Sequence, residues 1–184
     1  MNLGYVGSAI QGVIPDLLLK FKESHPRVLF SLKEMDNRKQ IEALQKREID
    51  LGFVRMERVP HGLTIQPVFE DTFSLVLPKN HFIDESNFVD LAQLKDEPFI
   101  FFDASYSESY YEKVMQIFDQ SHFTPIVSHY TVNANSIFRL VENELGISIV
   151  PTALKFGYDM GIKFIELNKI PQRTTLRAVW NSGS

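Results

Sequence analysis

Three polar side chains, those of Ser8, Asn37 and Arg55, each follow a short apolar run of the sequence. The runs span residues 3–6, 28–32 and 51–54. Two segments with helical spacing of apolar residues lie between the runs, so their order predicts a β-α-β-α-β unit with a parallel sheet. Ligands of such sheets bind beyond the carboxyl ends of the strands. A hydroxyl, an amide and a guanidinium should therefore meet at one edge of the sheet, where they could bind a small anion.

Each of these residues also has an ordinary structural interpretation. Ser8 stands where a helix N-cap is expected, and the N-cap of the next helix is either Asp36 or Asn37. Arg55 could pair at the surface with Glu57 or Asp71. As a binding group, the Ser8 hydroxyl would act together with the free N–H groups and the dipole of the helix that starts there. The planar guanidinium of Arg55 suits a carboxylate because it can donate two parallel hydrogen bonds. The residues alone leave both roles open.

The same order of elements starts again after a polar stretch at residues 79–87. Three further apolar runs alternate with two helical segments, and these runs span residues 99–102, 126–130 and 147–150. We expect a second β-α-β-α-β unit, which is an architectural repeat without sequence self-similarity. Two such units joined by two extended crossings would form two lobes with a ligand cleft between them.

The crossings are predicted at residues 73–77 and 176–180. They assign residues 1–74 and 178–184 to lobe I, and residues 75–177 to lobe II, within a few residues. The predicted fold class is α/β, with a sheet flanked by helices in each lobe.

Composition excludes several classes of function. The 184 residues carry a net charge of −4, which argues against a surface dedicated to nucleic acid. The chain has no cysteine and therefore no disulfide or thiolate chemistry, and its five histidines lack metal-ligand spacing. Neither a nucleotide-binding glycine motif nor a nucleophile with a supporting base is present. We therefore expect no metal, no cofactor and no enzymatic activity. The absence of a signal peptide or a long apolar segment favours a cytoplasmic protein.

Several motifs carry a resemblance to a known family. They are the run Gly4-Tyr-Val-Gly-Ser8, the run Ile49-Asp-Leu-Gly52 with Arg55 after it, and the run Leu145-Gly-Ile-Ser-Ile-Val-Pro151. In this order they resemble the effector-binding domain of LysR-type transcriptional regulators, most closely the members that respond to aromatic acids. The resemblance implies a two-lobed type 2 periplasmic-binding-protein fold with two crossover strands.

The resemblance also implies a site. A small effector, usually a carboxylate, would bind between the lobes, with Arg55 as its main partner beside the other two polar residues of lobe I. From lobe II we expect Ser105, Tyr110 and Asn133, which lie near the starts of helices. Tyr110 fits equally well as a residue that packs on its own helix face.

The family further implies partners. Its members form homodimers in which the first helix of lobe I packs against a lobe II helix, here at about residues 110–118, and tetramers in the full-length protein. They bind DNA through an N-terminal winged helix-turn-helix domain, which this sequence does not contain. We expect an excised regulatory domain that does not bind membranes. The alternatives are a solute-binding protein of a transport system and, third, an enzyme on the same fold.

Overall fold

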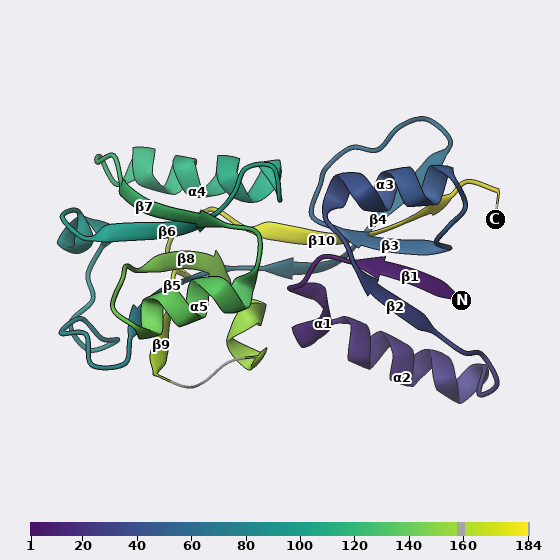
Figure 1. Cartoon of the computed structure of the whole chain (residues 1–184), viewed down its shortest axis with the longest axis horizontal. Helices are drawn as coiled ribbons and strands as arrows, with labels where there is room; N and C mark the ends of the chain where they lie inside the picture. The colour runs from purple at the N-terminus through teal and green to yellow at the C-terminus, as the bar shows by residue number, and fades with distance from the viewer. Residues whose placement is uncertain (158–160, 184) are drawn as a thin grey trace. The chain divides into compact units, whose positions relative to one another are not determined.

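The computed structural model describes residues 1–157 and 161–183, which form two compact units (Figure 1). Unit 1 comprises Met1–Asp71 and Thr175–Ser184, and unit 2 comprises Thr72–Thr174. These limits lie three residues before the predicted ones at positions 74 and 177. The chain passes between the units twice, directly after Asp71 and directly after Thr174.

Unit 1 is a five-stranded sheet in the order β2-β1-β3-β10-β4. Its strands are β1 (Asn2–Tyr5), β2 (Ser31–Glu34), β3 (Leu51–Val54), β4 (Leu63–Asp71) and β10 (Thr174–Asn181), and its helices are α1 (Ala9–Gly12), α2 (Ile14–Ser24) and α3 (Asn37–Gln45). Strand β1 pairs in parallel with β2 and β3, whereas β10 runs antiparallel to β3. The order β1-α-β2-α3-β3 is the predicted parallel unit, closed by one antiparallel strand.

Two apolar clusters lie on the two faces of this sheet. Phe53 of β3 belongs to one cluster, together with Leu3 and Ile14, and Val54 belongs to the other, together with Leu44. Successive residues of a strand point to opposite faces, so the short apolar run of β3 supplies both clusters. Helices α2 and α3 lie on opposite sides of the sheet in Figure 1.

Unit 2 repeats this topology. Its strands are β5 (Phe73–Pro78), β6 (Pro98–Phe102), β7 (Ile126–Thr131), β8 (Ser148–Pro151) and β9 (Ile162–Glu166), and its helices are η1 (Leu91–Leu94), α4 (Glu108–Gln120), α5 (Ala134–Glu142) and η2 (Thr152–Gly157). Strands β6 and β7 are parallel, and β5 runs antiparallel to β8 and β9. A parallel bridge between Phe99 and Ile147 joins the two sheets. The order β7-β6-β8-β5-β9 thus matches that of unit 1, with its antiparallel step at the same place.

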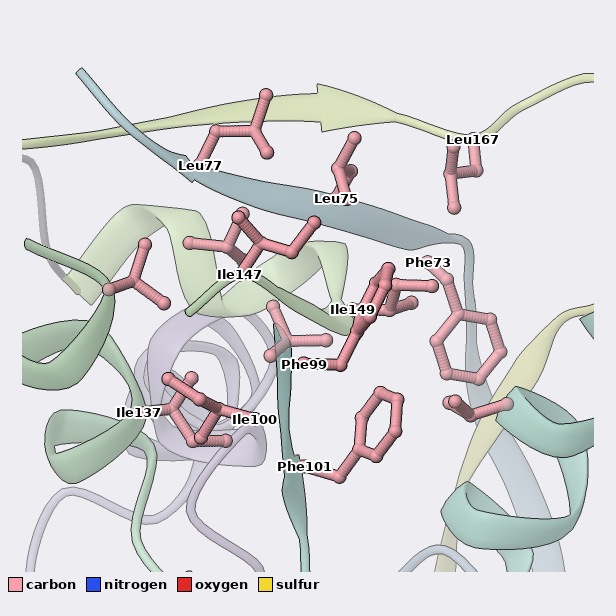
Figure 2. Close-up of a cluster of buried hydrophobic side chains, with 14 of the residues drawn as sticks. Phe73, Leu75, Leu77, Phe99, Ile100, Phe101, Ile137, Ile147, Ile149 and Leu167 are labelled. Atoms are coloured by element: carbon pink, nitrogen blue, oxygen red, sulfur yellow. The ribbon is translucent and has the colours of Figure 1, made fainter. Parts of the chain in front are cut away.

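The core of unit 2 contains side chains from the central strands β5, β6 and β8. Figure 2 shows Leu75 of β5 above Phe99 and Phe101 of β6, with Phe73 of β5 to one side, and all four side chains are fully buried. The rings of Phe99 and Phe101 lie 5.7 Å apart and both contact Phe118 of α4 edge-on. This cluster explains the phenylalanine-rich sequence of β6.

The predicted limits of the second strand were wrong by three residues at its start and by two at its end. It was expected at residues 28–32 but forms at Ser31–Glu34, and Leu29 is 85% exposed. The register is set by β1, because the Ser31 N–H donates to the carbonyl of Met1 and Asn2 pairs with Ser31. Local hydrophobicity did not contain this information.

The first predicted helix is interrupted before Pro15. It forms as α1 and α2, and Pro15 lies in the first turn of α2. Helix α1 is only four residues long, and the Ser8 side chain at its N-cap makes no capping hydrogen bond. No helix in residues 1–157 and 161–183 is long and apolar enough to cross a membrane.

Candidate functional site

The side chain of Arg55 lies at the carboxyl end of β3 and is 5% exposed. Its Nε donates a hydrogen bond to Oγ of Ser8, at 2.7 Å, and Ser8 follows the end of β1. Its Nη2 lies 4.0 Å from Oδ2 of Asp71, which is 7% exposed and ends β4. The pairing with Asp71 that the sequence left open is therefore formed, as a buried pair.

Asn37 holds the backbone of Arg55. Its Oδ1 accepts from the Arg55 N–H at 3.0 Å, and its Nδ2 donates to the Arg55 carbonyl at 3.4 Å. The N-cap of α3 is instead Asp36, whose side chain accepts from the Lys39 N–H at 2.8 Å. Of the two N-cap candidates, Asp36 therefore takes this role, and the amide of Asn37 is used by a residue 18 positions away. Asn37 thus fixes the place from which the guanidinium extends.

One turn further along α3, Gln40 holds Phe53 in the same way. Its Oε1 accepts from the Phe53 N–H at 2.9 Å, and its Nε2 donates to the carbonyls of Phe53 and Met35 at 3.0 Å each. Gln40 is fully buried. A Cβ at Gly52 would lie 2.9 Å from Gln40 Oε1, so the glycine leaves room for this amide.

Sequence reasoning did not assign Gln40 a role. The available signal was a polar residue three positions after Asn37 and directly before Ile41, on the face of the helix that turns to the sheet. Two amides at spacing i, i+3 on a helix can therefore mark a helix that binds the backbone of a neighbouring strand.

The positive charge beside Ser8 and Asn37 comes from the guanidinium of Arg55 rather than from a helix dipole. Helix α1 is a single turn, so the dipole expected beside Ser8 is small. The Ser8 hydroxyl is engaged by the guanidinium instead. Hydrogen bonds thus join Ser8, Asn37 and Arg55 at one edge of the sheet, as the strand-end rule predicted.

The three residues expected from lobe II all lie in unit 2, and each has local partners. Tyr110 is buried, its hydroxyl donates to the carbonyl of Ile149 at 2.6 Å, and its ring packs edge-on against Phe102. Burial raises the pKa of the Tyr110 hydroxyl well above its ordinary value. This arrangement favours the packing interpretation of Tyr110.

Ser105 and Asn133 are exposed and organise turns. The Ser105 hydroxyl donates to Oδ1 of Asp103 at 2.7 Å, and this bond lowers the pKa of the Asp103 carboxyl. Asn133 is the N-cap of α5, and its Oδ1 accepts from the backbone N–H groups of Asn135 and Ser136.

The described residues offer no metal centre. In residues 1–157 and 161–183, no three histidine or acidic side chains come together in a way that could hold a metal ion. What unit 1 does offer is a guanidinium at a strand end, held at its backbone by an amide and at its side chain by a hydroxyl and a carboxylate. Such a group can bind an anion by directed hydrogen bonds.

Comparison with known proteins now gives the family. The sequence model of the LysR substrate binding domain matches residues 1–184. This chain belongs to that family. Its type 2 periplasmic-binding-like α/β fold agrees with the resemblance seen in the sequence.

One curated relative is YnfL of Escherichia coli (strain K12), an uncharacterized HTH-type transcriptional regulator. It is 29% identical over 156 residues, which are 84% of this chain and 52% of YnfL. This chain spans about half the length of the curated relatives it matches first. The relatives are thus longer proteins named as HTH-type transcriptional regulators.

Two solved structures share the fold. The BenM effector binding domain with its effector benzoate has a TM-score of 0.85 and 22% identity, and covers 100% of this chain and 84% of its own. The effector binding domain of QuiR in complex with shikimate has a TM-score of 0.85 and 19% identity, and covers 100% of this chain and 88% of its own. At these identities, the likeness shows the fold alone.

Proposed function

We propose that this chain is the ligand-sensing domain of a LysR-type DNA-binding regulator, and that it binds a small organic anion through Arg55. The single observation that carries the proposal is the anchored, buried guanidinium at the carboxyl end of β3. Asn37 and Ser8 act as positioning residues in this proposal. The role is binding rather than catalysis, and needs no cofactor.

A carboxylate is the proposed charged group of the effector. An arginine whose backbone and side chain are both fixed loses little further conformational entropy when it binds a planar anion. Most of the favourable free energy of its hydrogen bonds therefore contributes to binding affinity. Benzoate and shikimate, found with two proteins of the same fold, both carry a carboxylate. We propose an aromatic carboxylate as the first class to test. Ser105, Tyr110 and Asn133 remain candidates from unit 2, with Tyr110 the weakest because its hydroxyl is used inside the core.

Thermal unfolding of the domain with a panel of aromatic and aliphatic carboxylates tests the proposal. A ligand at 100 times its Kd stabilises by about 2.7 kcal/mol, or roughly 5–10 °C in a domain of this size. This shift should vanish in Arg55→Lys, which keeps the charge but loses the planar fork, and persist in Arg38→Lys, at an exposed arginine of α3. If no carboxylate shifts the wild-type domain, the anion proposal fails.

In the full-length protein, we propose DNA binding by a separate N-terminal winged helix-turn-helix domain and assembly into homodimers and tetramers. The dimer would pair α2 of one protomer with α4 of its partner. Leu19 on α2 is 63% exposed, as such a contact requires. Leu19→Glu should lower the molecular mass measured by light scattering, whereas Leu145→Glu, at an exposed leucine of unit 2, should leave it unchanged.

The names of the relatives support a regulator over the alternative, a solute-binding protein that serves a transporter. The two roles differ in what must accompany this domain: a regulator carries a DNA-binding domain, and a transport protein carries an export signal or an anchor. A mobility shift of DNA from the neighbouring promoter by the full-length protein would decide for the regulator.

A further inference from the structure

Resting on the proposed function, we propose that Asp71 is an internal competitor for the effector. Its carboxylate pairs with Arg55 in the absence of a ligand, and the effector's carboxylate must displace or share it. Asp71 would then be a specificity-determining residue that sets the affinity of the site for anions.

The placement of Asp71 is unusual for its strand. The five preceding residues of β4, from Gln66 to Glu70, are exposed, whereas Asp71 is buried. A carboxylate that leaves water requires a compensating partner, because burial strongly disfavours its charged form. The guanidinium of Arg55, with Nη2 at 4.0 Å from Oδ2, is such a partner.

The geometry of the pair leaves room for exchange. A separation of 4.0 Å is longer than a charge-assisted hydrogen bond, which is typically about 2.7–2.9 Å. The bond from Arg55 Nε to Ser8, at 2.7 Å, is shorter than the contact with Asp71. An incoming carboxylate can therefore offer Arg55 a shorter contact than Asp71 does, while Ser8 keeps the guanidinium in place.

Competition has a cost that depends on charge. If the effector's carboxylate displaces Asp71, a buried carboxylate loses its contact with the guanidinium. If the two share the guanidinium, like charges come close together. Both outcomes weaken the binding of an anion, and neither affects an uncharged ligand of the same shape. An asparagine at position 71 removes this penalty without changing the size of the side chain.

The binding test compares benzoate with benzamide, its uncharged analogue, by calorimetric titration of three variants. We expect Asp71→Asn to bind benzoate roughly tenfold more tightly than the wild type, and benzamide with unchanged affinity. Asp71→Glu, which keeps the charge, should stay within about threefold of the wild type for benzoate. Asp16→Asn, at an exposed aspartate of α2, is the matched control for an added amide in unit 1. A benzoate affinity that is unchanged or weaker in Asp71→Asn overturns the proposal, as does an equal gain for benzamide.

A second measurement is independent of any ligand. A double-mutant cycle of Asp71→Asn and Arg55→Gln, measured by chemical denaturation, should show coupling between the two positions. Additive effects would overturn the pairing itself, whatever the ligand. Coupling between positions 71 and 55, with no benzoate binding by the wild type or by Asp71→Asn, would instead refute the proposed carboxylate site. The proposed competition would then fail with it.

Discussion

Replacing the buried amide of Gln40 by methionine should destabilise unit 1 by about 2–4 kcal/mol. Methionine keeps the length of the side chain but can donate and accept none of the three hydrogen bonds that Gln40 makes. The Phe53 carbonyl retains a bond from the Val6 N–H at 3.0 Å. The Phe53 N–H and the Met35 carbonyl lose the partner that Gln40 provides. Each such group costs roughly 1–3 kcal/mol when buried, and Met35 lies in a partly buried site, so the lower half of that range applies to it.

The assay uses the only tryptophan of the chain. Trp180 lies in β10 and packs against the apolar cluster of unit 1, so its fluorescence reports the unfolding of that unit. Urea titration of wild type and Gln40→Met, followed by this signal, gives the difference in unfolding free energy directly. Gln45→Met is the matched control, because Gln45 is exposed on the same helix. A difference of less than about 0.5 kcal/mol between the two variants would refute the role assigned to the Gln40 amide.

Three further predictions concern single contacts. Gly52→Ala should destabilise unit 1 by about 1–3 kcal/mol in the same urea assay, because the new Cβ would lie 2.9 Å from the Gln40 amide oxygen. Ser105→Ala should raise the pKa of Asp103 towards 3.8, as read by NMR titration of the carboxyl. In the wild type the pKa of Asp103 is lower in the folded state than in the unfolded state. The bond from Ser105 to Asp103 therefore stabilises the wild type above about pH 4, and this contribution disappears as the pH falls through the folded-state pKa. Tyr110→Phe should lower the free energy of unfolding by about 1–2 kcal/mol, measured by chemical denaturation, because a buried carbonyl of β8 loses its hydroxyl donor.

The sequence predicts the strands best where one run of residues must fill two faces of a sheet. The run at residues 51–54 became β3 with the expected limits, because its side chains supply apolar clusters on both faces. The run at residues 28–32 failed as a strand because hydrophobicity does not encode pairing. Strand β2 starts where the Ser31 N–H reaches the Met1 carbonyl, a bond between residues 30 positions apart.

The candidate site, like the strands, was predictable in some respects and not in others. The meeting of Ser8, Asn37 and Arg55 was predictable, because parallel strands in a β-α-β-α-β unit bring their carboxyl ends to one edge. Their individual roles were not, because an amide at a helix start fits an N-cap and a backbone contact equally well. Tyr110 presents the same ambiguity on α4, where one helix face can be turned to the core or to a ligand.

The contacts of Arg55 divide into those that hold its backbone and those that hold its side chain. Asn37 fixes the backbone of Arg55, and Gln40 fixes that of Phe53, two residues earlier in the chain. These hydrogen bonds cannot be released without leaving peptide groups unpaired. The contact of the guanidinium with Asp71 is the one that the proposed effector would exchange, while Ser8 would keep the guanidinium in place. Asp71 is the last residue before the chain enters unit 2. Under the proposed competition, the change of partner would take place at the residue that precedes this crossing, whereas the backbone bonds from Asn37 and Gln40 would be kept.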